Sequence, residues 1–146
     1  MIESRPLAPP IKQTILAVDD DPLALRVLRQ MLLQRGYEVV DKPSGEEAFA
    51  YLETATPDLI VLDVAMPGLS GYDVCRRIRS EARTANIPII FLTSKSLLMD
   101  MAEGSDAGSD LYLIKPVTAT KLLNMVGMFL SKDGPLARKP RTVETT

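Results

Sequence analysis

The chain has 146 residues, of which 46% are apolar and 25% are charged, proportions typical of one soluble globular domain. It contains no histidine and one cysteine, Cys75, which excludes catalytic triads, histidine-bound zinc and an internal disulfide. The formal net charge of −2 gives no sign of a nucleic-acid surface. Because no apolar run could span a bilayer and residues 1–13 lack a secretion signal, we expect a cytoplasmic protein that binds neither membranes nor nucleic acid directly.

Short apolar runs alternate with longer amphipathic stretches along the chain, a pattern typical of βα units around a parallel sheet. Most of these runs are almost entirely aliphatic, as expected for strands buried between two layers of helices. The expected strands are 14–18, 37–41, 58–62, 88–92 and 111–114. The pattern therefore predicts a doubly wound α/β fold with helices on both faces of the sheet.

Capping patterns mark most of the expected helices. They place the first three helix starts at Asp21 with Pro22, at Ser44 with Glu47 and, more weakly, at Ser70 with Asp73. The first helix is expected to end at Gly36, and the fifth to begin near Thr118. The fourth, over Ser96–Ala107, has a narrow apolar face and is expected to be the mobile element.

The two ends of the chain differ in composition from the expected domain, which covers residues 14–130. Residues 1–13 and 131–146 are predicted to be flexible extensions, the second of them rich in proline, threonine and basic residues. We interpret this tail as a solvated segment, with a linker to a further domain or a basic contact arm as the alternatives.

Polar residues follow four of the expected strands. They are Asp19 and Asp20 after the first, Asp63 after the third, Thr93 after the fourth and Lys115 after the fifth. In a doubly wound sheet of order 2-1-3-4-5, ligands bind where the carboxyl ends of the first and third strands meet. Asp20 and Asp63 then become neighbours. Taken singly, each residue has a simpler interpretation as a helix cap, a turn or a strand-end hydroxyl, so only their joint placement predicts a site.

Carboxylates about 5 Å apart repel one another by about 3 kcal/mol at an effective dielectric near 20, so a cation is expected among them. Ligands that are all oxygen atoms, with positions left for water and phosphate, suit Mg²⁺ better than Ca²⁺. Lys115 would add a second positive charge. These are the groups that phosphoryl transfer requires, and a carboxylate oxygen is the expected acceptor.

Four segments resemble the CheY-like receiver domain of two-component response regulators. They are TILAVDDD from Thr14, LIVLDVAMPGLSG from Leu59, IIFLTS from Ile89 and LYLIKP from Leu111. The resemblance, which runs from about residue 14 to 130, implies a flavodoxin-like sheet of order 2-1-3-4-5. It also implies a phosphorelay role, with Mg²⁺ as cofactor and a phosphoryl group taken from a phosphohistidine of a sensor histidine kinase or histidine phosphotransfer protein. Such a domain catalyses only its own phosphorylation and dephosphorylation.

The resemblance assigns roles to individual positions. Asp63 would be the phosphoacceptor and, with Asp20, a direct Mg²⁺ ligand. Asp19 would act on the ion largely through bound water, and Ala65 through its backbone carbonyl. Lys115, in a cis bond to Pro116, would pair with the phosphoryl oxygens.

Further positions are expected to affect the conformational switch and the lifetime of the acylphosphate. Thr93 and Tyr112 match the switch hydroxyl and the aromatic switch residue, while Ala65 and Lys95 flank the path of the water that would hydrolyse the acylphosphate. Phosphorylation is expected to rearrange the fourth helix, fifth strand and fifth helix. That face would bind a downstream protein or, in the phosphorylated state, a second copy of the chain.

Other functions are also open. The chain is either a stand-alone receiver or part of a longer regulator. A receiver-like scaffold that acts without phosphorylation is one alternative. An aspartyl-phosphate phosphohydrolase is another, suggested by Asp19-x-Asp21, although Pro22 and Leu23 do not complete its motif. A nucleotide- or flavin-binding module is disfavoured because the chain lacks a glycine-rich phosphate loop.

Overall fold

The computed structural model describes residues 12–94, 96 and 108–131. Five strands form a parallel sheet in the order β2-β1-β3-β4-β5. Their bounds are Thr14–Val18 for β1, Glu38–Lys42 for β2, Leu59–Asp63 for β3, Ile89–Thr93 for β4 and Leu111–Ile114 for β5. This order confirms the doubly wound fold expected from the sequence.

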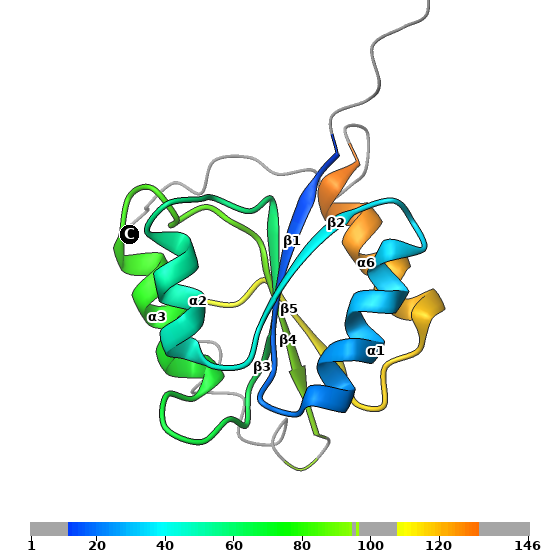
Figure 1. The fold of residues 1–146 in the computed structure, drawn as a ribbon, viewed down its shortest axis with the longest axis horizontal. Helices are drawn as coiled ribbons and strands as arrows, with labels where there is room; N and C mark the ends of the chain where they lie inside the picture. The colour runs from blue at the N-terminus through cyan, green and yellow to red at the C-terminus, as the bar shows by residue number, and fades with distance from the viewer. Residues whose placement is uncertain (1–11, 95, 97–107, 132–146) are drawn as a thin grey trace, which may run out of the picture.

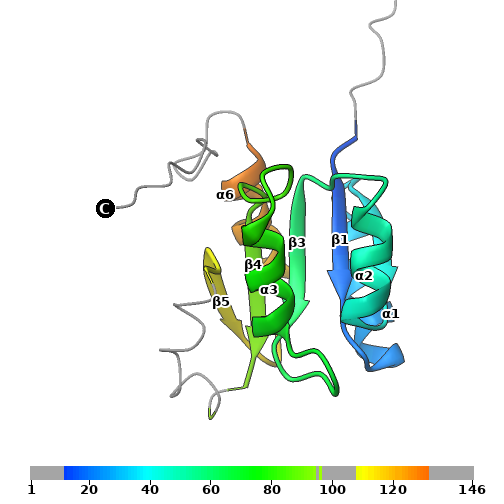
Figure 2. The same cartoon turned by 90° about the vertical axis from the view of Figure 1, so that its left-hand side faces the viewer.

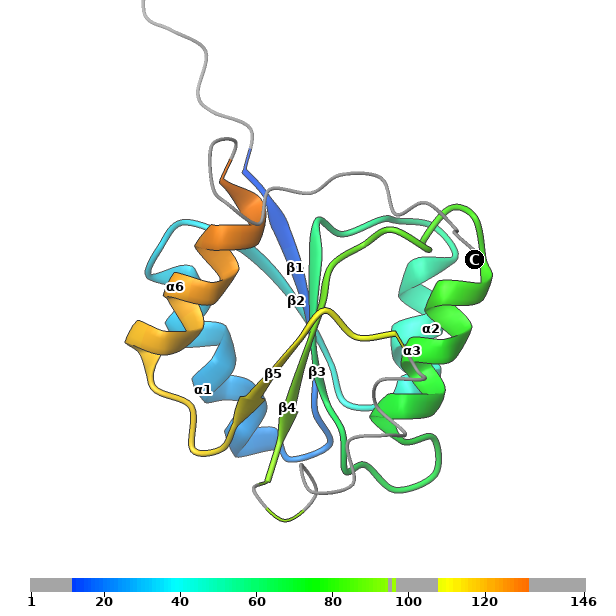
Figure 3. The same cartoon turned by 180° about the vertical axis from the view of Figure 1, so that it is seen from behind.

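Helices cover both faces of the sheet. The pair α1 (Pro22–Leu33) and α6 (Ala119–Leu130) packs on one face, and α2 (Gly45–Leu52) and α3 (Gly71–Ser80) pack on the other (Figure 1). The same two layers are seen from behind in Figure 3. The expected fourth helix lies outside the described residues, apart from Ser96.

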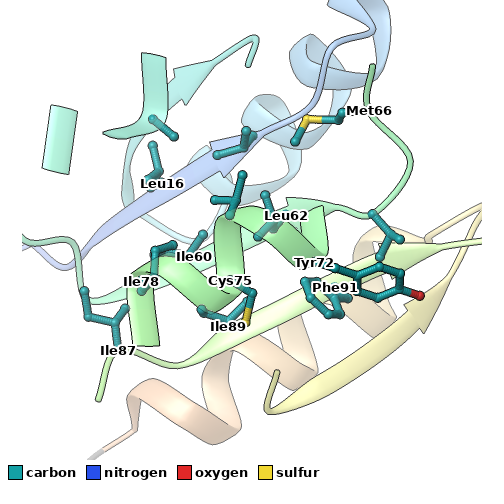
Figure 4. Close-up of a cluster of buried hydrophobic side chains, with 14 of the residues drawn as sticks. Leu16, Ile60, Leu62, Met66, Tyr72, Cys75, Ile78, Ile87, Ile89 and Phe91 are labelled. Atoms are coloured by element: carbon teal, nitrogen blue, oxygen red, sulfur yellow. The ribbon is translucent and has the colours of Figure 1, made fainter. Parts of the chain in front are cut away.

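Alternate residues of the central strands supply two separate cores. Leu16, Ile60 and Phe91 point toward α2 and α3, whereas their neighbours Ile15 and Val61 point toward α1 and α6. Figure 4 shows the first cluster, in which the rings of Tyr72 and Phe91 meet edge to face with centroids 5.4 Å apart. Burial of both strand faces explains why these strands are aliphatic throughout. Cys75 is part of the first core, as expected.

The helix starts follow the capping patterns in the sequence. Asp21 accepts a hydrogen bond from the backbone of Leu23, and Ser44 accepts one from Glu47. At Ser70 and Asp73 both halves of the capping box are made, although this was the weaker pattern. The first turn of α3 is therefore firmly held beside the end of β3.

Three strands begin and end one residue later than predicted. The ladder pairs Asp63 with Leu92 and Thr93 with Ile114, so Asp63 and Thr93 are the last residues of β3 and β4 and do not follow them. Asp58 is excluded from β3, and its carboxylate instead accepts a hydrogen bond from the Thr14 backbone. The correction leaves both side chains at the expected edge.

The carboxyl ends of β1, β3 and β4 lie together at one edge of the sheet, at the bottom of Figure 2. The helices among the described residues are all too short or too polar to cross a bilayer. The carboxyl edge of the sheet carries the polar residues that the sequence singles out, Asp63 and Thr93 in the strands and the others directly after them.

Gly71, the first residue of α3, allows the helix to approach the end of β3 closely. A Cβ atom there would overlap the Asp63 carbonyl oxygen and lie 2.8 Å from the Val64 Cα. Both obstacles are backbone atoms, which cannot rotate away. The Gly71 N–H donates to the Val64 carbonyl at 2.9 Å.

We expect Gly71→Ala to destabilise the domain by about 1–3 kcal/mol, because the added methyl group must displace backbone. Gly127→Ala is the matched control, since a Cβ atom at that helical glycine meets nothing within 4 Å. It should stabilise the domain by about 0.5–1 kcal/mol. Urea unfolding measures both changes, and equal effects of the two variants would contradict the close approach at Gly71.

Candidate functional site

Three carboxylates meet at the carboxyl edge of the sheet. Asp19 and Asp20 directly follow β1, and Asp63 ends the neighbouring strand β3. Asp19 and Asp63 are only 1% and 3% exposed, whereas Asp20 is exposed. One carboxylate oxygen from each residue lies within 4.8 Å of the other two. The structure thus brings together the three acidic residues that the sequence analysis placed at this edge.

Asp19 is held by the backbone around it. Its N–H donates to the Lys42 carbonyl at the end of β2, and its Oδ1 accepts a hydrogen bond from the Asp21 N–H at 3.0 Å. The other oxygen, Oδ2, is buried, finds no hydrogen-bond partner among the residues that the structure describes, and lies 3.7 Å from the Lys115 Nζ. A buried carboxylate oxygen with no donor is costly unless a positive group approaches it.

Lys115 contributes the positive charge of the cluster. Its Nζ lies 2.8 Å from Asp63 Oδ1, and its side chain is 39% exposed. The Lys115 N–H donates to the Thr93 carbonyl, which continues the β4–β5 ladder one step beyond β5. The Lys115–Pro116 bond is cis, as the resemblance to receiver domains implied.

The cluster holds more negative charge than Lys115 neutralises. Burial raises the pKa of Asp63 above its usual value, Lys115 acts in the opposite sense, and Asp19 adds to the increase. Burial alone would lower the pKa of Lys115, but the hydrogen-bonded Asp63 and nearby Asp19 raise it overall. Both groups therefore favour the proton-bound form, as expected where negative charge is in excess.

This donor set fits a hard divalent cation. The ligands are carboxylate oxygens from Asp19, Asp20 and Asp63, and the unpartnered Asp19 Oδ2 faces the lysine side of the same cluster. Mg²⁺ prefers such oxygen ligands and retains several waters beside one or two carboxylates. The exposed position of Asp20 leaves one side of the cluster open to solvent.

Thr93 and Tyr112, the expected switch residues, lie on neighbouring strands. Thr93 is buried, and its hydroxyl donates to the Ser94 carbonyl at 3.4 Å. The Tyr112 ring packs on Phe91, with centroids 5.5 Å apart. Its hydroxyl oxygen is buried and finds no hydrogen-bond partner among the described residues. Burial raises the pKa of Tyr112, and Ser109 offsets part of this increase.

Two positions, Ala65 and Lys95, are expected to affect the lifetime of the acylphosphate. Ala65 is exposed in the loop after β3, two residues beyond Asp63. Lys95 lies outside the described residues. The structure therefore places only Ala65 beside the acidic cluster.

A groove beside the cluster was missed in the sequence analysis. It has a volume of about 530 Å³ and is lined by α1, by Leu92 and by the residues from Lys115 to Val117. Leu23 and Val27, which are 65% and 44% exposed, lie along it. The signal was present in the sequence, since both side chains lie off the α1 stripe of Leu25, Leu28 and Leu32 that enters the core.

Comparison with known proteins identifies the family. A family model for the response regulator receiver domain matches residues 15–127. The chain therefore belongs to the receiver domain family of response regulators, as its motifs suggested. The transcriptional regulatory protein AfsQ1 of Streptomyces coelicolor is 41% identical over 104 residues, which are 71% of this chain and 45% of AfsQ1. The chain thus spans about half the length of the curated relatives it matches.

Two solved receiver domains show the same fold. That of a signal transduction histidine kinase from Syntrophus aciditrophicus superposes with a TM-score of 0.78 at 31% identity, over 92% of this chain and 98% of that one. That of a sensor histidine kinase from Pseudomonas aeruginosa PAO1 has a TM-score of 0.74 at 33% identity, over 80% and 96% of the two chains. The second structure carries a magnesium ion coordinated in its active site cleft.

The raised pKa of Asp63 predicts a pH dependence of stability. The native state binds this proton more tightly than the unfolded chain does, so the stabilisation is present at low pH and is lost as pH rises through the folded-state pKa. Without metal, we expect the wild type to lose stability relative to Asp63→Asn as pH rises from about 4. Urea unfolding at a series of pH values, in the presence of a chelator, measures this difference. Parallel curves for the two proteins would contradict it.

Proposed function

We propose that the chain is a phosphorylation-controlled receiver in which Asp63 accepts a phosphoryl group from a phosphohistidine. The observation that carries the proposal is the buried Asp63 carboxylate, paired with Lys115 at 2.8 Å inside a cluster of three carboxylates. A carboxylate acceptor, a fixed cation and a cation-binding cluster are the parts that phosphoryl transfer needs. We expect the chain to work in the cytoplasm, with a sensor histidine kinase or histidine phosphotransfer protein as donor.

Each residue has a defined part in the transfer. A carboxylate oxygen of Asp63 attacks phosphorus, and the bond from phosphorus to the donor nitrogen breaks as the acylphosphate forms. Lys115, no longer paired with an ionised carboxylate, binds a phosphoryl oxygen. Asp19, Asp20, Asp63 and the Ala65 carbonyl would hold Mg²⁺, which supplies charge neutralisation for the carboxylates and the phosphoryl oxygens.

Thr93 and Tyr112 would transmit the change. The Thr93 hydroxyl now donates to the neighbouring Ser94 carbonyl, a local contact that a phosphoryl oxygen could replace. Tyr112 packs on Phe91, whose own ring contacts Tyr72 on α3. A shift of Thr93 would therefore alter β4 and its neighbour β5. Together with α6, the expected fifth helix, β5 is the described part of the face that we expect to bind a downstream protein or a second copy.

Two alternative functions make different predictions. A scaffold that acts without phosphorylation would bind partners equally well with Asn at position 63. An aspartyl-phosphate phosphohydrolase would turn over an aryl phosphate many times and would need Asp19, which here accepts a backbone hydrogen bond beside a helix cap. The ion pair between Asp63 and Lys115 favours Asp63 as the acceptor.

The phosphoacceptor is tested by intact mass after incubation with acetyl phosphate and Mg²⁺. We expect the wild type to gain about 80 Da, the mass of one phosphoryl group, and Asp63→Asn to gain nothing. Omission of Mg²⁺ should abolish the gain. Full modification of Asp63→Asn would refute the assignment, and the decay of the wild-type adduct reports the combined effect of Ala65 and Lys95 on lifetime.

The groove along α1 is suited to hold the donor protein. It is lined by Asp19 and Lys115 at one end and by apolar residues of α1 along its length, so a protein bound there lies next to Asp63. Exposed apolar side chains beside a charged site are typical of a protein contact surface. We therefore expect Leu23 and Val27 to contact the donor.

Leu23→Gln should slow phosphoryl transfer from a phosphorylated histidine phosphotransfer protein by about tenfold or more, because a central apolar contact is lost. The rate with acetyl phosphate should stay within about twofold, since Leu23 is not a member of the acidic cluster and a small donor does not need the groove. Leu33→Gln is the matched control, because Leu33 is another exposed leucine of α1, at 44%, but lines a different groove. Quenched-flow transfer assays measure both rates, and equal slowing by the two variants would exclude the groove as the docking site.

A further inference from the structure

Arg79, near the end of α3, contacts four other residues through its guanidinium. Its guanidinium donates to the carbonyl oxygens of Gly108 at 2.8 Å, Ala85 at 3.0 Å and Ile87 at 2.6 Å. It also forms an ion pair with the Asp110 carboxylate at 2.7 Å. The two side chains are only 12% and 15% exposed. Short charge-assisted hydrogen bonds of this kind fix geometry strongly.

Asp110 passes this constraint to the sheet. The carboxylate oxygen that binds Arg79 also accepts a hydrogen bond from the Ile89 N–H at 2.8 Å, and the Asp110 N–H donates to the Ile89 carbonyl at 2.9 Å. Ile89 is the first residue of β4, and Asp110 directly precedes β5. Arg79 thus fixes where β5 begins relative to β4.

The side chains of β5 specify its register only weakly. The strand reads Leu-Tyr-Leu-Ile, so a slip of two residues would place Leu113 where Leu111 lies and Ile114 where Tyr112 lies. Such a slip keeps Leu113 and Ile114 on their own faces of the sheet, although it would bring Lys115 to the buried position of Leu113. It would move Lys115 by about 6.6 Å, at about 3.3 Å per residue. An apolar edge strand needs a polar contact at one end to set its position.

We propose that Arg79 is a positioning residue for Lys115, acting from the opposite edge of the sheet through Asp110 and β5. Four strand residues separate Asp110 from Lys115, and the ladder runs unbroken from the Ile90–Leu111 pair to the Lys115 N–H on Thr93. The start of α3 contacts the end of β3 through Gly71. One helix therefore fixes both Asp63 and, through Arg79, the lysine that pairs with it. This inference rests on the proposed phosphoacceptor function.

The test compares Arg79→Lys, which keeps the charge but not the four-way contact, with Asp110→Asn, a milder change at the same contact. Arg76→Lys is the matched control, because Arg76 lies on the same helix, is 42% exposed and pairs with Asp73. The full chain is used, with acetyl phosphate and saturating Mg²⁺, and intact mass is followed over time. We expect phosphorylation by Arg79→Lys and Asp110→Asn to be at least about tenfold slower, and Arg76→Lys to be unchanged.

A role limited to stability is distinguished by two further measurements. Mg²⁺ affinity, which depends on the acidic residues as ligands and is opposed by the nearby charge of Lys115, should not fall in Arg79→Lys. When Arg79→Lys is added to Lys115→Ala, the rate should not fall further, because the two changes act through one group. Amide resonances of Leu113 and Lys115 should shift in Arg79→Lys, while those of Val39 and Val40 on β2, at the other side of the sheet, should not.

The outcomes separate this inference from the proposed function. A wild type that takes no phosphoryl group refutes the function, and the amide shifts still test the position of Lys115. A phosphorylated wild type with an equally fast Arg79→Lys variant overturns the inference alone. The inference is also overturned if Mg²⁺ affinity falls in parallel with the phosphorylation rate. It is overturned likewise if Arg79→Lys lowers this rate as much in the Lys115→Ala background as in the wild type. If Arg79→Lys does not fold, the same measurements on Asp110→Asn test the inference.

Discussion

The crowding of negative charge at the end of β1 and β3 is the constraint on which the site depends. Because these strands are neighbours and parallel, Asp19 and Asp63 must end at the same edge, and both are almost completely buried. Lys115, which comes from β5 at the far side of β4, is the cation that offsets them. The pocket keeps an excess of negative charge and therefore favours the binding of a proton or a metal ion. A cluster that is electrostatically unfavourable alone becomes favourable once a cation binds.

The two faces of the sheet serve this edge in different ways. On one face, α2 and α3 are joined by the Arg77 guanidinium, 4.1 Å above the Phe49 ring, and by Arg83, which binds the Leu52 and Ala55 carbonyls at the end of α2. These contacts hold α3 firmly against the sheet. On the other face, α1 leaves a groove that opens beside Asp19 and Lys115. One layer thus positions the reacting groups, and the other offers a surface to a partner.

Within the part of the chain that the structure describes, the acidic cluster is exposed at Asp20 and Lys115. Asp63 is buried by the sheet and by the loop to α3, while Asp20 is exposed and Lys115 is partly exposed. Under the proposed function, a phosphoryl donor would approach over Asp20 and Lys115, beside the α1 groove. The arrangement would give the proposed phosphoacceptor a carboxylate that is both desolvated and reachable. It also explains why apolar contacts outside the acidic cluster are expected to affect a protein donor and not a small one.

The sequence by itself determined the fold class, the strand order through its family motifs, and the identity of the clustered carboxylates and lysine. It could do so because aliphatic strands and polar strand ends are local features, readable from composition and spacing. Three strands begin and end one residue later than the sequence predicted, because ladder hydrogen bonds with a neighbouring strand decide where a strand stops. The shape of the groove beside Leu23, the close approach at Gly71 and the contacts of Arg79 were decided by the tertiary structure. The groove and the Arg79 contacts join segments far apart in the chain, Arg79 and Asp110 being 31 residues apart. Gly71 meets the nearby Asp63 and Val64 only because α3 packs back onto the end of β3.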